Sequence, residues 1–107
     1  MEVHVENGDG CCRIGLDGEL TIYTAAQAKE SLLAAMADAK EVEMNLAHVN
    51  EIDAAGLQLL ALVKREAADR QQSLQFVTHS QSVLDMLDLC NLAGVFGDPV
   101  VLSHEMN

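Results

Sequence analysis

Residues 42–60, VEMNLAHVNEIDAAGLQLL, decide the fold because they join a strand pattern directly to a helix pattern. Val42, Met44 and Leu46 alternate with polar residues, which is the two-residue period of a half-buried strand. A dense series of leucines follows, and it indicates a helix over residues 54–70. A strand that runs almost directly into a helix is the repeating unit of an α/β fold.

The entrance to this helix combines a carboxylate with three small residues, Asp53, Ala54, Ala55 and Gly56. An Asp just before a helix accepts hydrogen bonds from the free N–H groups of the first turn and complements the positive end of the helix dipole. Because the residues that follow have little side-chain bulk, the start of the helix should be open to close contact. Capping alone explains Asp53, and a further role in recognition stays open.

The flanking sequence extends the same alternation of strands and helices. The patterns predict strands over residues 3–5, 11–20, 41–46, 74–77 and 99–102, and helices over residues 24–39, 54–70 and 80–90. Residues 7–10, NGDG, are a strong turn signal between the first two strands. Thr24 and Ser80 are the expected N-caps, with Gln27 completing a capping box, and Asn91 suits the end of the last helix.

Repeated strand–helix–strand units imply a largely parallel sheet, to which the opening hairpin adds an antiparallel edge. The strands alternate in polarity instead of being apolar throughout, so one face of the sheet should be polar. The 107 residues are enough for one domain. The sequence therefore predicts a single α/β domain over residues 1–107, with a mixed, mostly parallel sheet of about four or five strands and helices packed mainly on one face.

Composition limits the partners that the surface can attract. Aromatic residues are scarce (Tyr23, Phe76 and Phe96), so the core should be aliphatic and a platform for stacking bases is not expected. Six basic against seventeen acidic residues give a net charge of -11. Such a surface repels nucleic-acid backbones and anionic lipid headgroups, whereas a protein with a basic patch would be attracted. We expect neither nucleic-acid binding nor membrane insertion.

The cysteines and the apolar segments favour a cytoplasmic protein. Cys11, Cys12 and Cys90 are odd in number, include an adjacent pair that seldom bridges, and lack C-x-x-C spacing, so reduced thiols are expected. Residues 1–10 are acidic and lack the apolar segment of a signal peptide. No apolar run has the length that crosses a bilayer.

Catalytic and metal-binding motifs are absent from the sequence. There is no G-x-S-x-G, Walker loop, G-x-G-x-x-G or H-E-x-x-H pattern. His48 and His79 each follow a predicted strand, at the edge of the sheet where α/β folds bind ligands. A metal or acid–base pair there is one interpretation, and two solvated loop histidines are the simpler one. We expect no catalytic residue, no metal ligand and no cofactor.

The leucines of the second helix spread around most of its circumference. One stripe must pack on the sheet, and the rest must be covered by neighbouring helices or form an exposed apolar interface. The residues concerned are Leu57, Leu59, Leu60, Leu62 and Val63.

Three segments together resemble the STAS domain, the module of sulfate transporters and bacterial anti-sigma factor antagonists. They are residues 16–32 (LDGELTIYTAAQAKESL), residues 42–60 and residues 80–96 (SQSVLDMLDLCNLAGVF). The stretch IDAAGLQLL resembles the family signature D-[ST]-[SAT]-G-L. The LTIYTA version is similar to free-standing STAS proteins found alongside bacterial chemotaxis genes. Asn91 stands where the family commonly has Gly, and Asn tolerates the same backbone conformation.

The resemblance implies a non-catalytic module that binds a protein. Anti-sigma factor antagonists bind an anti-sigma factor that is also a Ser/Thr kinase, and phosphorylation of a hydroxyl at the start of the second helix ends the interaction. The phosphorylated position corresponds to Ala55, which cannot accept a phosphate. We therefore expect a regulatory partner, an anti-sigma or histidine-kinase-like ATPase or a chemotaxis-linked protein, to bind at Asp53, Ala54, Ala55, Gly56 and Leu57 without phosphorylation at that position.

Two alternatives stay open. Small STAS proteins are also accessory subunits of ABC-type phospholipid transporters, where they bind an ATPase. A small-ligand or nucleotide-binding domain that uses the loops after the strands is the other, although no phosphate loop is present. If a kinase does act on the chain, it must use a different hydroxyl, and the candidates are Thr21, Thr24, Thr78, Ser80 and Ser82.

Overall fold

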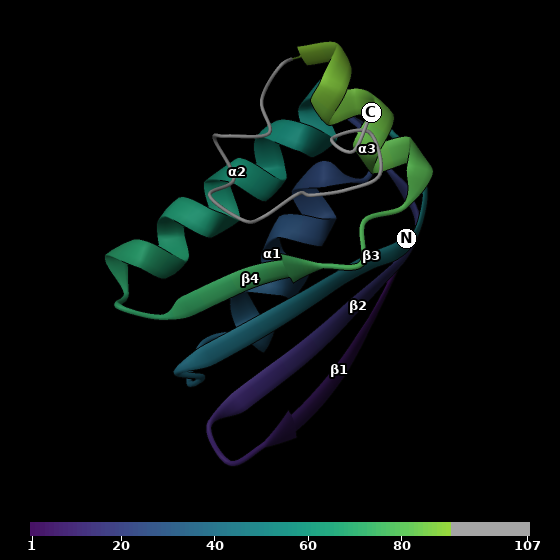
Figure 1. Cartoon of the computed structure of the whole chain (residues 1–107). Coiled ribbons are helices and arrows are strands. Elements are labelled where there is room, and N and C mark those ends of the chain that lie inside the picture. The colour runs from purple at the N-terminus through teal and green to yellow at the C-terminus, as the bar shows by residue number, and fades with distance from the viewer. Residues whose placement is uncertain (91–107) are drawn as a thin grey trace.

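The computed structural model describes residues 1–90, which form one four-stranded sheet with three helices packed against it (Figure 1). In chain order the elements are β1 (Glu2–Gly8), β2 (Cys11–Leu20), α1 (Ala25–Ala35), β3 (Glu41–Ile52), α2 (Ala54–Asp69), β4 (Ser73–Val77) and α3 (Gln81–Cys90). The strand expected over residues 99–102 and the helix end expected at Asn91 lie outside the described residues.

The sheet confirms the predicted mixed, mostly parallel topology. Its strands lie in the order β1-β2-β3-β4, with β1 antiparallel to β2 and the other two pairs parallel. The helices gather on one side of the sheet, as Figure 1 shows, and leave the other side open. The apolar side chains of β2 and β3 point toward the helices, while the alternate residues are exposed.

The first hairpin turns at the predicted place. Gly8 pairs with Cys11, and the two residues between them, Asp9 and Gly10, have φ angles of 50° and 80°. Positive φ at both central residues defines the two-residue turn whose twist matches that of paired strands. The strand before it, β1, is longer than the three residues expected.

The predicted end of β3 at residue 46 is wrong, because the strand continues to Ile52. Its buried side chains follow a two-residue period up to Leu46 and then continue as Val49 and Ile52, in steps of three. The pairing with β2 shifts twice, and β3 contains one extra residue at each shift. At the first of these bulges the displaced N–H of Ala47 donates to Oδ1 of Asn45, 2.8 Å away.

The capping box expected at the start of α1 is also wrong. Thr24 is the N-cap residue, but its side chain accepts no hydrogen bond from the first turn of the helix. Its hydroxyl instead accepts from the N–H of Thr21 and donates to the carbonyl oxygen of Glu19, because the preceding loop folds back on itself. The helix ends at Ala35, with Met36 as its C-cap, rather than at residue 39.

The core lies between the sheet and the helices and is aliphatic except for Phe76 and Cys12. Its largest fully buried side chains are Ile14, Leu16, Leu20, Leu32, Met36, Met44, Leu46, Leu60, Leu87, Val42 and Val49. The leucine-rich face of α2 is covered by neighbouring elements, because Leu57, Leu59, Leu60 and Val63 are all buried. Leu62 is the exception, with 36% of its surface exposed.

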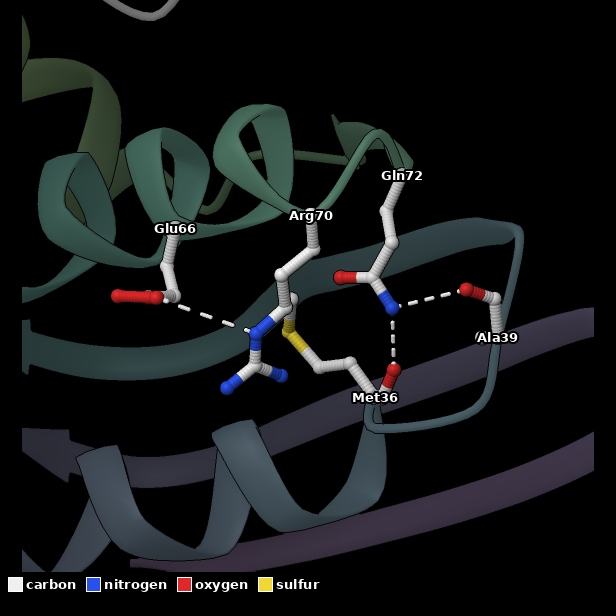
Figure 2. A network of polar contacts seen from close by, with 5 residues as sticks. All are labelled: Met36, Ala39, Glu66, Arg70 and Gln72. Atoms are coloured by element: carbon white, nitrogen blue, oxygen red, sulfur yellow. Dashed lines mark hydrogen bonds and ion pairs between the residues drawn. The ribbon is translucent and has the colours of Figure 1, made fainter.

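The end of α2 and the end of α1 are held by the same short connection. Gln71 adopts a left-handed φ of 60°, and the N–H groups of Gln71 and Gln72 donate to the carbonyls of Ala68 and Ala67, which is the Schellman arrangement of a helix end. Figure 2 shows the Gln72 side chain extending to the end of α1, where Nε2 donates to the carbonyl oxygens of Met36 and Ala39. One amide therefore bonds to two carbonyls at and just beyond the end of α1, of which that of Met36 also accepts from the N–H of Ala39.

The predicted N-cap of α3 is confirmed. The hydroxyl oxygen of Ser80 accepts a hydrogen bond from the N–H of Val83 and donates to the carbonyl oxygen of Val49, 2.7 Å away. The start of α3 is therefore fixed to β3. Among the described residues, the helices lack the combination of length and apolar content that a membrane crossing requires.

Candidate functional site

Asp53 joins the start of α2 to the loop between β2 and α1. Its Oδ1 accepts from the N–H of Gly56 at 2.9 Å, and its Oδ2 accepts from the N–H of Ile22 at 3.0 Å. Its own N–H donates to the carbonyl oxygen of Leu20 at 3.3 Å. The carboxylate therefore caps the helix, as the sequence predicted, and also holds a loop that lies 31 residues earlier in the chain.

These hydrogen bonds favour the charged form of the carboxyl group. The bond from Gly56 N–H, and next the bond from Ile22 N–H, hold the pKa of Asp53 below its ordinary value. Asp53 is therefore a carboxylate at neutral pH, and both of its oxygens are engaged by backbone donors. It is positioned to fix two elements relative to each other and not to transfer a proton.

Gly56 lies where the start of α2 closely approaches the end of β2. A Cβ at this position would lie 2.1 Å from the carbonyl oxygen of Leu20 and 3.0 Å from Cγ1 of Ile52. Contacts this short to a backbone atom do not occur, so a side chain at position 56 would force the helix away from the end of the strand. The glycine in the helix entrance is explained by this contact with the strand, independently of any partner.

The five residues expected to bind a partner divide into two groups. Gly56 and Leu57 are buried, and Leu57 has 2% of its surface exposed. Ala54 is exposed, whereas Ala55 and Asp53 are half-buried. A partner can therefore contact Ala54, Ala55 and part of Asp53. Gly56 and Leu57 instead pack inside the protein and determine the position of the helix start.

Sequence reasoning missed the loop beside this helix start. Ile22 and Tyr23 lie between β2 and α1 with 67% and 94% of their surfaces exposed. The hydrogen bond from Ile22 to Asp53 brings this loop to the N-terminus of α2. One signal was available in the sequence: in a chain with three aromatic residues, the single tyrosine stands next to Ile22, and the two apolar residues lie between Thr21 and Thr24 just after a strand.

Most of the alternative phosphate acceptors are engaged in structural hydrogen bonds. The hydroxyls of Thr24, Ser80 and Ser82 donate to backbone carbonyls of Glu19, Val49 and Asn50, in that order. Thr21 is buried, and its hydroxyl accepts from the N–H of Tyr23. Thr78 is exposed and has a φ of 53°.

The expected position of His48 is wrong: it lies inside β3, exposed on the open face opposite Asp17, because the strand extends to residue 52. His79 does follow a strand, as predicted, and is half-buried. Within the described part of the chain, the group whose atoms could surround a metal ion is instead Glu2, His4 and Asp17, with candidate ligand atoms within 4.8 Å of one another. All three are exposed on β1 and β2, and exposed carboxylates commonly gather without binding an ion.

Two further features lie away from Asp53. A shallow hollow of about 470 Å³ on the open face lies over Gly15 and is lined in part by His4 and Arg13. Cys11 is half-buried and Cys12 is buried, and both are free thiols as expected. Burial, and next the neighbouring Cys11, raise the pKa of the Cys12 thiol, which makes it a weak nucleophile.

A family comparison agrees with this fold and with the resemblance in the sequence. The family model described as "Mlab, STAS domain" matches residues 3–102. The chain therefore belongs to the STAS domain family. No curated protein matches the chain with significant similarity.

Solved structures share the fold over nearly the whole chain. An anti-sigma factor antagonist from Mycobacterium paratuberculosis is 22% identical with a TM-score of 0.77, and the match covers 98% of this chain and 90% of that one. A protein described as a candidate anti-sigma factor antagonist from Thermotoga maritima is 18% identical with a TM-score of 0.78, covering 97% and 91%. SpoIIAA in its unphosphorylated form is 18% identical with a TM-score of 0.70, covering 98% and 92%.

The fold also occurs as one part of longer chains. The match to the structure of Mglu, at 22% identity and a TM-score of 0.65, covers 73% of this chain and 20% of that one. The fold alone therefore does not determine the function of the protein that carries it.

Proposed function

We propose that the protein is a non-catalytic STAS module of the anti-sigma factor antagonist type, which binds a regulatory protein at the N-terminus of α2. The observation that carries the proposal is the hydrogen bonding of Asp53, which joins the start of α2 and the loop at Ile22 into one continuous surface. The solved structures with the same fold include several anti-sigma factor antagonists, which supports the same class of function.

The proposed surface is always competent to bind. In the sequence resemblance, Ala55 occupies the position of the phosphorylated hydroxyl, and neither Ala54 nor Ala55 can accept a phosphate. Ala54 is exposed and Ala55 half-buried, so a partner can approach the helix start closely. Activity of the module would then depend on its abundance or on its partner, and not on phosphorylation at this position.

The partner we propose is a cytoplasmic anti-sigma or histidine-kinase-like ATPase, or a chemotaxis-linked signalling protein. Asp53, Ala54 and Ala55 would contact this partner. Gly56 and Leu57 are buried and would contribute indirectly, by holding the start of α2 in position. No catalytic role is proposed for the chain, because the carboxylate at the site has both oxygens engaged by backbone N–H groups.

The test compares the wild-type protein with Ala55→Asp and Ala55→Ser in pull-downs from the native cell, followed by titration of the purified partner. A carboxylate near a helix N-terminus is well accommodated, so Ala55→Asp should fold normally. It should nevertheless place charge in the contact and weaken binding at least tenfold, about 1.4 kcal/mol, whereas Ala55→Ser should bind like the wild type. Equal binding by all three proteins would count against this surface.

A second candidate function is an accessory subunit of an ABC-type phospholipid transporter. The family model that matches the chain is described as "Mlab, STAS domain", without reference to anti-sigma factor antagonists. Because small STAS proteins also include accessory subunits of such transporters, this match leaves room for the transport function. The same pull-down separates the two candidates. Recovery of a transporter ATPase that the Ala55→Asp variant loses would favour the transport function, and recovery of a soluble kinase-like ATPase would favour the regulatory one.

A further inference from the structure

The backbone N–H groups of the loop between β2 and α1 are hydrogen-bonded within the protein although the loop is exposed. The N–H groups of Thr21, Ile22 and Tyr23 donate to the Thr24 hydroxyl, the Asp53 carboxylate and the Thr21 hydroxyl. The next two N–H groups both donate to the carbonyl oxygen of Thr21. Five consecutive backbone donors are therefore satisfied inside the protein, over residues 21–25.

The side chains in the middle of this loop are nevertheless apolar and exposed. Tyr23 has 94% of its surface in contact with solvent and Ile22 has 67%. A fixed backbone that presents two large apolar side chains loses little conformational entropy when they become buried in a complex. Tyrosine in particular offers a large contact area with few rotatable bonds, and it is enriched among the residues that dominate binding energy.

The loop lies in a predominantly acidic part of the chain. Residues 14–28 and 41–63 include no Lys or Arg, and the basic residues of the elements that flank the loop are Arg13 in β2 and Lys29 in α1. The acidic residues of these two ranges are Asp17, Glu19, Glu41, Glu43, Glu51 and Asp53. Glu19 and Glu51 are exposed and lie directly opposite each other on neighbouring strands. Like charges in this position oppose each other, and a cation supplied by a partner would relieve the repulsion.

We propose that Ile22 and Tyr23 form the anchor of the partner interface, and that they insert into an apolar pocket rimmed by Arg and Lys on the partner protein. This inference rests on the proposed function, which it deepens by stating the chemistry of the partner. Ile22 and Tyr23 supply the buried apolar contact, Glu19 and Glu51 supply the charged rim, and Asp53 holds the loop against α2.

The experiment uses the full chain and the purified ATPase that the pull-down recovers. Tyr23→Ala and Ile22→Ala are measured beside Leu89→Ala, which removes a side chain that is 80% exposed on α3. Because all three side chains are exposed, the urea midpoints should stay unchanged. We expect Tyr23→Ala to weaken binding by at least about tenfold, Ile22→Ala by less, and Leu89→Ala not at all. Tyr23→Phe, which keeps the aromatic ring, should retain most of the wild-type affinity.

The charged rim is tested separately. Binding of the wild type should weaken as salt is added, and the double variant Glu19→Gln, Glu51→Gln should show a shallower salt dependence. An unchanged salt dependence in the double variant would contradict the basic rim. Placing a photo-crosslinking amino acid at position 23 should then yield a cross-link to a surface of the ATPase that contains Arg or Lys.

The outcomes separate this inference from the proposed function. If Ala55→Asp abolishes binding and Tyr23→Ala leaves it intact, the α2 surface stands and the anchor is refuted. If Tyr23→Ala abolishes binding and Ala55→Asp does not, the anchor stands and the contact at the start of α2 is wrong. If the cross-linker at position 23 captures no more protein than the same group at position 89, the anchor is also refuted.

Discussion

The α-carbon of Gly56 lies so close to the end of β2 that a Cβ there would sit 2.1 Å from the carbonyl oxygen of Leu20. The same carbonyl oxygen accepts the N–H of Asp53 at 3.3 Å. The helix start is therefore seated on one backbone group of a neighbouring strand, and the surface around Ala54 and Ala55 depends on that contact.

Gly56→Ala should destabilise the protein strongly although alanine favours helices. The gain in helix propensity is about 1 kcal/mol. Steric overlap with a backbone atom outweighs it, and we expect a net loss at the upper end of about 1–3 kcal/mol or beyond. Urea denaturation measures the change. Gly8→Ala is the matched control, because a Cβ at Gly8 meets nothing within 4 Å, and its midpoint should not fall.

Asp53→Asn should lower stability in a pH-dependent way. The variant keeps one acceptor oxygen, so it can cap Gly56 or hold Ile22 but not both in the present arrangement. Because the folded-state pKa of Asp53 is depressed, its contribution is fully present above the unfolded value of about 3.9 and is lost as the pH falls through the folded value.

Urea denaturation of both proteins from neutral to acidic pH measures this effect. The wild type should have the higher midpoint at neutral pH, and the two curves should converge at the acidic end. A difference that persists unchanged at the lowest pH would mean that the charge of Asp53 does not contribute. The amide of Ile22 should also exchange faster with solvent in the variant, because it loses its acceptor.

Gln71→Gly should stabilise the protein by about 0.5–1 kcal/mol, because Gln71 has a φ of 60° that glycine adopts without steric strain. Thermal or urea denaturation measures the change. Gln58→Gly provides the contrast, since Gln58 is exposed within α2 and the same change there should destabilise by about 1 kcal/mol. Equal effects at both positions would contradict the role of the left-handed conformation.

Gln72→Met and Gln72→Glu should separate the hydrogen bonds of this amide from its shape (Figure 2). Methionine keeps the length and loses both donated bonds, for which we expect a loss of about 1 kcal/mol. Glutamate places negative charge against the carbonyls of Met36 and Ala39, at the negative end of α1, and should destabilise more at neutral pH.

The neighbouring ion pair provides the control for Gln72. Glu66 and Arg70 lie 3.9 Å apart with more than a third of each side chain exposed. Glu66→Gln should change stability by less than about 0.5 kcal/mol, since exposed pairs contribute little. A larger loss from Glu66→Gln than from Gln72→Glu would contradict this ranking.

The fold was largely predictable from the sequence, because burial imposes its period on the chain. Val42, Met44 and Leu46 in β3 occupy the core as their spacing indicated. The far half of β3 was not predictable in this way. Each bulge adds a residue, so the apolar positions move to three-residue steps and no longer resemble a strand.

The candidate site was only half predictable. Asp53 was identified from its position before the helix, since capping depends on local sequence. The bond to Ile22 spans 31 residues and depends on how two strands end side by side, which no local pattern encodes. For the same reason the exposure of Tyr23 was missed, and Gly56 and Leu57 were expected at the surface although they are buried.

Between Asn45 and Ile52, β3 contains two residues more than the part of β2 with which it pairs, and each is taken up by a bulge. The residues after each bulge return to regular pairing, so Ile52 lies opposite Leu20 and Asp53 remains within reach of Ile22. A homologue could therefore have one residue fewer at a bulge and keep the assembled surface, because the shorter strand would restore the ordinary two-residue alternation. In comparing related chains, the D-A-A-G motif is best aligned from the start of the helix, and a one-residue gap between Leu46 and Asp53 does not by itself indicate loss of the site.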